Sequence, residues 1–98
     1  MKRNVSHHEL AEFELNEAAD YFDAKHPGLG RSFILEVKRA VSQITNHPES
    51  AKPLKETARR KVIRRFPYSV IYSLSPETIR ILAIASHRRR PFYWRGRT

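Results

Sequence analysis

Residues 78–97 read TIRILAIASHRRRPFYWRGR, and this stretch decides the fold. It begins as an apolar run rich in isoleucine and alanine, which predicts a buried strand. At His87 it changes to five arginines interleaved with Phe92, Tyr93 and Trp94. A core strand therefore carries a basic, aromatic tail to the surface, where guanidinium groups can bind phosphates or carboxylates and rings can stack or fill a partner's pocket. In the alternative interpretation the three rings fold back onto the core, as most large side chains do.

Charge is distributed unevenly along the chain. The 98 residues are enough for one domain, 1–98, with a thin core, and the formal net charge is +9. Residues 1–50 carry 6 Lys/Arg against 8 Asp/Glu, while residues 51–98 carry 13 against 2. A field of this sign concentrates polyanions near one face, so nucleic acid, a ribosomal surface or an acidic protein is the expected partner. The alternative is that the positive charge serves solubility alone.

The composition excludes several classes of protein. Cysteine is absent, which excludes disulfides and thiolate chemistry. The longest unbroken apolar run, residues 81–85, is far shorter than the roughly 20 residues of a membrane-spanning helix. The N-terminus does not lead into the apolar stretch of a secretory signal. We therefore expect a soluble, cytoplasmic chain without a membrane partner.

A helix start is marked near residue 6. Ser6 and Glu9 have the spacing of a capping box with Ser6 as the N-cap, and Val5 and Leu10 have the spacing of a hydrophobic staple. The helical period then continues to about residue 25. Its predicted core face contains Leu10, Ala11, Leu15, Ala18, Ala19, Tyr21 and Phe22. Phe13 falls among the acidic residues of the other face and is a candidate for partner contact.

A second helix follows the break HPGLG at residues 26–30, where proline and two glycines permit a tight reversal. It should end near residues 46–48, NHP. Its predicted core face contains Leu29, Phe33, Ile34, Val37, Ala40, Val41 and Ile44. Leu35 lies off this apolar stripe. The two helices are expected to form an antiparallel hairpin.

Beyond a loop at residues 48–57 the period changes from 3.6 to 2. Residues 59–66, 68–75 and 78–86 are predicted to be three strands of an antiparallel meander, with residues 1–5 as a candidate edge strand. Neither the meander nor the helical hairpin can bury its apolar face alone, so each should cover the other. The expected fold class is α+β, with a helical hairpin on a three- to four-stranded antiparallel sheet in the order (β)ααβββ.

Side chains that can move protons or stabilise a phosphorane occur in the basic half. The candidate catalytic residues are Arg60, Arg64, His87, Arg88 and Tyr93, because metal-free RNA cleavage needs a base, an acid and cations. A structural role for His87 is the alternative. Candidate contacts for nucleic acid or a partner are Lys52, Lys55, Lys61, Arg65, Arg89, Arg90, Trp94, Arg95 and Arg97. No metal-ligand spacing or phosphate-cradling glycine loop is present, so neither a metal nor a cofactor is expected.

Two amphipathic helices around HPGLG, then RRFPYSVIY, then IRILAIASHRRRPFYWRGR, resemble the RelE/ParE family of bacterial type II toxin–antitoxin toxins. The resemblance covers about residues 8–97. It implies a helical hairpin on an antiparallel sheet, a cytoplasmic location, and a cognate antitoxin whose extended, often acidic segment neutralises the toxin and could cover Phe13 and Leu35. RelE-like members cut mRNA in the ribosomal A site, whereas ParE-like members inhibit DNA gyrase without a nuclease centre.

The catalytic pattern of RelE-like toxins is matched in part. The matching residues are Arg60, Arg64, Arg88 and Tyr93. Val62 and Ser69 stand where that pattern has a lysine and an arginine. The resemblance therefore implies a ribosome-dependent mRNA endonuclease as the first expectation. Its alternatives are a gyrase inhibitor and a degenerate module member that only binds its antitoxin.

Overall fold

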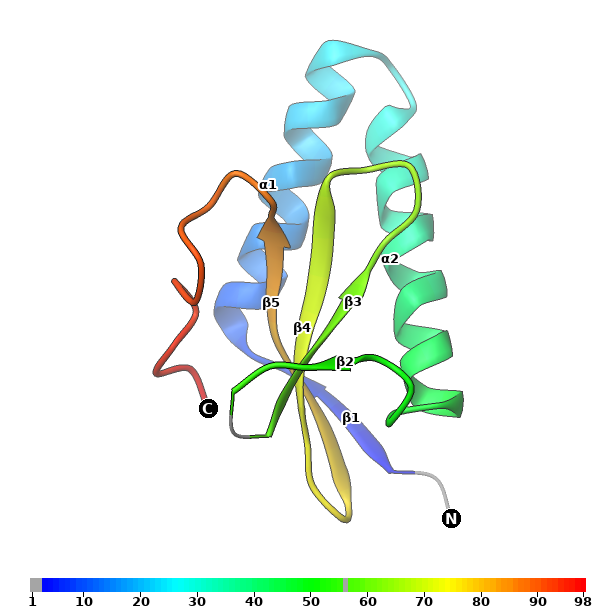
Figure 1. The fold of residues 1–98 in the computed structure, drawn as a ribbon. Helices are drawn as coiled ribbons and strands as arrows, with labels where there is room; N and C mark the ends of the chain where they lie inside the picture. Colours follow the sequence, from blue (N-terminus) through cyan, green and yellow to red (C-terminus); the bar gives the residue numbers. More distant parts are fainter. Residues whose placement is uncertain (1–2, 56) are drawn as a thin grey trace.

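Two antiparallel helices cover one face of a five-stranded sheet in this computed structural model, which describes residues 3–55 and 57–98 (Figure 1). In chain order the elements are β1 (Asn4–His7), α1 (Glu9–Lys25), α2 (Leu29–Asn46), β2 (Lys52–Pro53), β3 (Ala58–Val62), β4 (Tyr68–Leu74) and β5 (Thr78–Ser86). The α+β class and the helical hairpin are as predicted. None of the helices in these residues is long and apolar enough to span a bilayer.

The strands lie in the order β1-β5-β4-β3-β2. The meander from β2 to β5 is antiparallel, but β1 runs parallel to β5, with Asn4 opposite Thr78 and His7 opposite Ile81. The sheet is therefore mixed and has five strands, which corrects the expectation of a wholly antiparallel sheet with three or four.

Strand β1 covers the otherwise open edge of β5, the longest strand of the sheet. It was predicted over residues 1–5, of which residues 1 and 2 lie outside the described part of the chain. The strand that the sequence did not predict is β2, which lies within the predicted loop at residues 48–57.

The predicted capping box at the start of α1 is wrong. Ser6 lies in β1 opposite Arg80, and the N-cap is His8, whose Nδ1 accepts a hydrogen bond from the Leu10 amide at 3.0 Å. Pairing with β5 holds the chain extended through β1, so the helix can begin only after it. Val5 and Leu10, the two residues of the predicted staple, are both exposed.

The turn between the helices depends on two glycines. Gly28 has a φ of +88°, a left-handed conformation that suits a residue without a Cβ. At Gly30 a Cβ would meet the carbonyl oxygen of Ala19, so the two helices can approach this closely only with glycine there. The Gly30 amide donates to Oδ1 of Asp23 at 2.7 Å, which ties the start of α2 to the end of α1.

The main core lies between the helices and the sheet. The predicted stripe of α2 is confirmed, since Phe33, Val37, Ala40 and Ile44 are buried and the other three members pack against them. On α1 the prediction was wrong for Leu10 and Tyr21, which are exposed because they lie at the margins of the apolar stripe. Phe13 and Leu35 are exposed, as the sequence predicted.

Strand β3 ends at Val62, earlier than the predicted strand over residues 59–66. A turn follows in which Arg65 adopts a positive φ of 71° and the side chains of Ile63 and Phe66 are buried in the main core. The turn accounts for the cations at the end of this stretch, because Arg64 and Arg65 project from the turn and not from the face of a strand.

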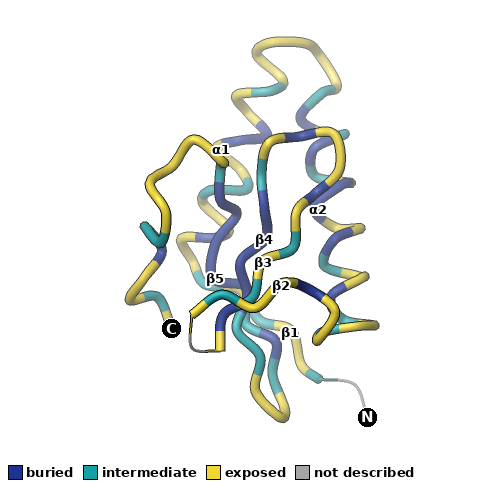
Figure 2. Tube along the Cα trace, viewed as in Figure 1, coloured by how far each residue is buried: buried dark blue, intermediate teal, exposed yellow. Residues whose placement is uncertain are grey.

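The opposite face of the sheet carries a second, smaller core. The residues that build it include Ala58, Ile71, Leu82, Ala83, Ala85 and Trp94, with Leu54, Phe92 and Tyr93 packed against them. The C-terminal tail, residues 87–98, therefore folds back beside β5 (Figure 1). Figure 2 shows that β4 and β5 are mostly buried while most of the tail is exposed, and the covered part of the tail centres on Trp94. Trp94 is only 8% exposed, so the interpretation in which the rings return to the core holds for this residue.

Candidate functional site

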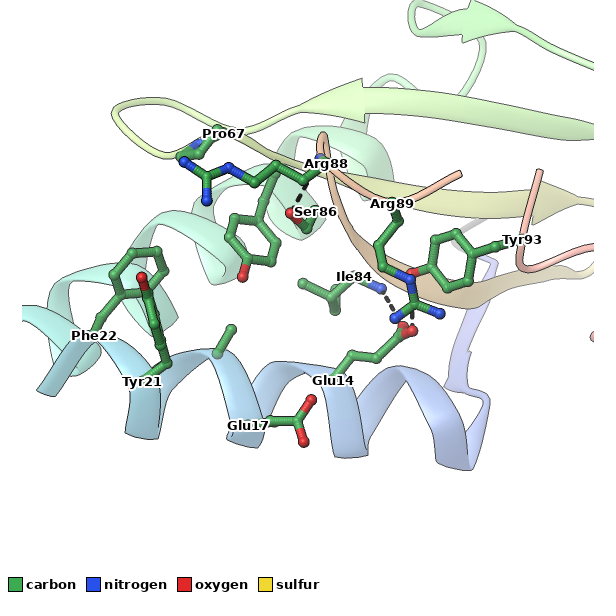
Figure 3. A pocket seen from close by; sticks show the side chains of 12 residues that line it. Glu14, Glu17, Tyr21, Phe22, Pro67, Ile84, Ser86, Arg88, Arg89 and Tyr93 are labelled. Atoms are coloured by element: carbon green, nitrogen blue, oxygen red, sulfur yellow. Dashed lines mark hydrogen bonds between the residues drawn. The ribbon is translucent and has the colours of Figure 1, made fainter. Parts of the chain in front are cut away.

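Glu14, on α1, is the point at which the tail is fixed to the domain. Its Oε1 accepts hydrogen bonds from the Ile84 amide at 3.0 Å and from Nη1 of Arg97 at 2.9 Å. Its Oε2 accepts from the Tyr93 hydroxyl at 2.8 Å and from Nη2 of Arg97 at 3.0 Å. Figure 3 shows the carboxylate pointing from the helix towards Ile84 and Tyr93. The ion pair is largely buried, since the two side chains are only 11–12% exposed.

Tyr93 is held in its protonated form. Burial raises the pKa of its hydroxyl far above the ordinary value of 10, and the hydrogen bond to Glu14 raises it further. The guanidinium of Arg89 lies over the ring, 3.9 Å from its centroid. The hydroxyl thus donates to a carboxylate inside the protein, and the ring is covered by an arginine.

A groove of about 510 Å³ lies between α1, the ends of β4 and β5, and the tail (Figure 3). Its walls include the aromatic side chains of Tyr21, Phe22 and Tyr68, and Arg88 and Arg89 lie at the end of β5. Tyr21 is 53% exposed here. We call this hollow the aromatic groove. Glu14 and Glu17 line the groove on the side of α1. An apolar surface with carboxylates on one side and two guanidinium groups on the other suits an amphipathic partner segment.

A second hollow of about 270 Å³ lies on the other side of the tail, over the open face of the sheet. We call it the basic cleft. Ser69, 1% exposed, lies in its wall, and its Oγ accepts a hydrogen bond from Nε of Arg60 at 3.2 Å and lies 2.8 Å from Nε2 of His87. Desolvation of the ring and then the charge of Arg60 lower the pKa of His87, which favours a neutral imidazole.

The five predicted catalytic residues do not gather at one point. Arg60 and His87 meet in the basic cleft, but Arg88 lies in the aromatic groove. Arg64 lies in the exposed turn after β3. Tyr93 forms part of the wall between the two hollows, with its hydroxyl turned to Glu14.

The predicted contact residues divide between exposed and engaged side chains. The exposed ones are Lys52, Lys55, Arg65, Arg89, Arg90 and Arg95, while Lys61 is half-buried. Lys55 lies over the Phe92 ring at 4.7 Å and Arg65 over the Phe66 ring at 5.6 Å. Trp94 and Arg97 belong to the interior, one in the smaller core and the other in the ion pair with Glu14, so neither is presented for contact.

Sequence reasoning missed Glu14 and misjudged Ser69. Glu14 sits on the acidic half of α1 like its neighbours, and its partner Arg97 is 83 residues away, so no local pattern marks it. In the sequence, Ser69 stands out only as the replacement of an arginine. Ser69 lies next to Tyr68 in a strand segment that is buried, and a buried hydroxyl needs hydrogen-bond partners. This position was the signal in the sequence that could have marked Ser69.

Residues 5–91 match a family model described as the ParE toxin of type II toxin-antitoxin system, parDE. The chain belongs to the ParE toxin family. A chain in a solved structure, the chromosomal ParDE TA system from P. aeruginosa, shares the fold with a TM-score of 0.76 at 16% identity, covering 86% of this chain and 95% of that chain. No curated protein matches the sequence. The protein is thus a ParE-type toxin of a type II toxin–antitoxin system, and a cognate antitoxin is its partner.

Proposed function

We propose that this toxin acts by inhibiting DNA gyrase and that it does not cleave RNA. Gyrase inhibition is the activity that the sequence resemblance associates with ParE-like members, and the family match favours that branch. The observation that carries the proposal is the Tyr93 hydroxyl, which is bound to Glu14 and keeps its proton. A phenol held this way is a poor acid for a leaving oxygen, because its proton already serves an internal carboxylate.

The distribution of the arginines supports the same proposal. A nuclease centre needs its base, its acid and its cations within hydrogen-bond reach of one phosphate. Here Arg60 and His87 lie on one side of the tail and Arg88 on the other. Val62 and Ser69 supply no cation, and Ser69 instead orients Arg60.

We propose further that the antitoxin occupies the aromatic groove. A few residues carry most of the binding energy in protein interfaces, and tyrosine is enriched among them. Tyr21 is exposed beside the buried Ala18 and the half-buried Tyr68. Arg88 and Arg89 would pair with acidic side chains of the incoming segment. The bound antitoxin would then cover Tyr21, which the core of the toxin leaves exposed.

Two assays on the same antitoxin-free preparation test the proposed target. In the first, the toxin is titrated into a gyrase supercoiling reaction. In the second, it is added to a cell-free translation reaction and the 5′ ends of the mRNA are mapped. We expect loss of supercoiling with intact mRNA. Cuts that depend on engaged ribosomes, with supercoiling undiminished, would overturn the proposal.

A further inference from the structure

The basic cleft has the character of an anion site. Arg60, Arg89 and Arg90 lie in its wall, and among the described residues that line it there is no carboxylate. Its position is set by the sheet on one side and by the folded tail on the other, so its shape depends on the Glu14 anchor described above. The guanidinium of Arg89 covers the Tyr93 ring, which leaves Arg60 and Arg90 as the two free cations among the described residues of the cleft. Two guanidinium groups with no carboxylate beside them in this described lining favour a ligand with more than one negative charge.

Ser69 orients the polar groups of the cleft before any ligand arrives. Its buried hydroxyl accepts from Nε of Arg60 and contacts Nε2 of His87. With Nε engaged, the Nη atoms of Arg60 are the part of the guanidinium that can fork onto two oxygens of a ligand. The neutral imidazole of His87 adds a further hydrogen-bonding group at the same place.

The rest of the lining is apolar. Leu54, Ile71, Ala85 and the aromatic residues Phe92 and Trp94 complete the cleft. The volume of about 270 Å³ is far larger than one phosphate requires and approaches the lower end of sites for small organic ligands, about 300 Å³. The ligand should therefore have a flat or apolar body as well as an anionic group.

We propose that the basic cleft binds a phosphate monoester on a nucleotide-sized group, as in a nucleoside monophosphate or the phosphorylated end of a nucleic acid. A phosphate monoester carries about −1.5 to −2 at neutral pH, against −1 for a carboxylate or a phosphodiester, and so balances the two guanidinium groups of Arg60 and Arg90 best. The body of the nucleotide lies against the apolar lining. Binding requires no catalysis and is independent of the proposed gyrase target.

Isothermal titration of the antitoxin-free toxin tests the site directly. The ligands are adenosine 5′-monophosphate, adenosine and inorganic phosphate. We expect the monophosphate to bind, inorganic phosphate to bind at least tenfold more weakly, and adenosine to give no heat of binding. No binding of the monophosphate would overturn the proposal. Equal affinity for inorganic phosphate would contradict the proposal that the ligand carries a nucleotide-sized group.

Two matched variants separate a specific site from the general positive field. Arg60→Gln removes a charge inside the cleft, and Arg64→Gln removes one from the exposed turn close by in the chain. We expect Arg60→Gln to weaken monophosphate binding at least tenfold and Arg64→Gln to change it less than twofold. Equal losses would overturn the proposal, because they would show non-specific attraction. Arg90→Gln serves in place of Arg60→Gln if circular dichroism shows that the latter is misfolded.

An independent readout is the His87 imidazole, followed by NMR. A bound dianion beside Ser69 should raise the pKa of His87 from its lowered value, since a negative charge favours the imidazolium. An unchanged His87 titration at saturating monophosphate would place the ligand elsewhere and contradict the site. Gyrase inhibition has no part in these measurements, so failure of one proposal leaves the other standing.

Discussion

A carboxylate that loses most of its water must recover hydrogen bonds from the protein, and Glu14 recovers four from three residues. Two of these residues, Tyr93 and Arg97, belong to the tail, and the third, Ile84, belongs to β5. At the scale of single residues, Tyr93 and Arg97 therefore have a part in holding the fold together. Their side chains hold the tail against α1.

Glu14→Gln tests the anchor. The substitution keeps the shape of the side chain but leaves the guanidinium of Arg97 largely buried without its counter-charge. Removing one partner of a buried ion pair costs about 3–5 kcal/mol, and we expect a loss near 3 kcal/mol because the glutamine oxygen can still accept. Urea unfolding measures it. Glu12→Gln, on the exposed side of the same helix, is the matched control and should change stability by less than about 0.5 kcal/mol.

The raised pKa of Tyr93 also predicts that the protein loses stability in alkali. Its folded pKa is raised above the unfolded value of 10, so its contribution is complete below pH 10 and is lost as the pH rises further. Tyr68 and Tyr72 have raised pKa values as well, mainly through burial, so part of the decline should remain without Tyr93. We expect urea unfolding of Tyr93→Phe to show a smaller loss of stability above pH 10 than the unsubstituted protein. Parallel curves for the two proteins would show that the raised pKa is not coupled to folding.

At the scale of elements, the C-terminal tail covers part of the sheet face and forms the two hollows with it. It covers Ile71 and Leu82 with Trp94, and it forms a wall shared by the aromatic groove and the basic cleft. A segment without regular strands or helices thus shapes both candidate sites, because the sheet and the ion pair hold it in place.

The aromatic groove gives a prediction about the antitoxin. Tyr21→Ala removes an exposed ring that lines the groove, whereas Phe13→Ala removes an exposed ring of the same helix outside it. We expect Tyr21→Ala to weaken antitoxin binding by about tenfold or more, and by more than Phe13→Ala. Titration calorimetry with the purified antitoxin measures both. The reverse order would place the antitoxin over Phe13 and contradict the proposed docking.

The elements differ in how far the sequence could predict them. Helix α2 and strands β4 and β5 were predicted closely, because their apolar periods are local and strong. The parallel pairing of β1 was missed, since it depends on β5, more than 70 residues away. The missed N-cap follows from that pairing. In the candidate sites, sequence placed Arg60 and His87 in the basic half but could not reveal Glu14, whose partners are equally remote in the chain.

At the scale of the whole molecule, the positive charge is consistent with membership of the ParE toxin family. The second half of the chain carries a net charge of +11 and the first half −2, which suits the proposed docking of an acidic antitoxin segment. The same charge does not distinguish a nuclease from an inhibitor, because both bind polyanionic or acidic surfaces. The arrangement around Tyr93 is what favours the inhibitor.

The toxicity of Tyr93→Phe tests that claim most directly. The substitution removes the hydroxyl that a nuclease would need and keeps the ring under Arg89. Growth inhibition on induction is compared with that of the unsubstituted toxin at equal protein levels, after circular dichroism has shown that the fold is intact. Our account predicts that toxicity and inhibition of gyrase supercoiling are retained within about threefold, the effect of losing one internal hydrogen bond on a binding surface. A folded Tyr93→Phe that no longer inhibits growth would contradict the account and return the hydroxyl to a catalytic role.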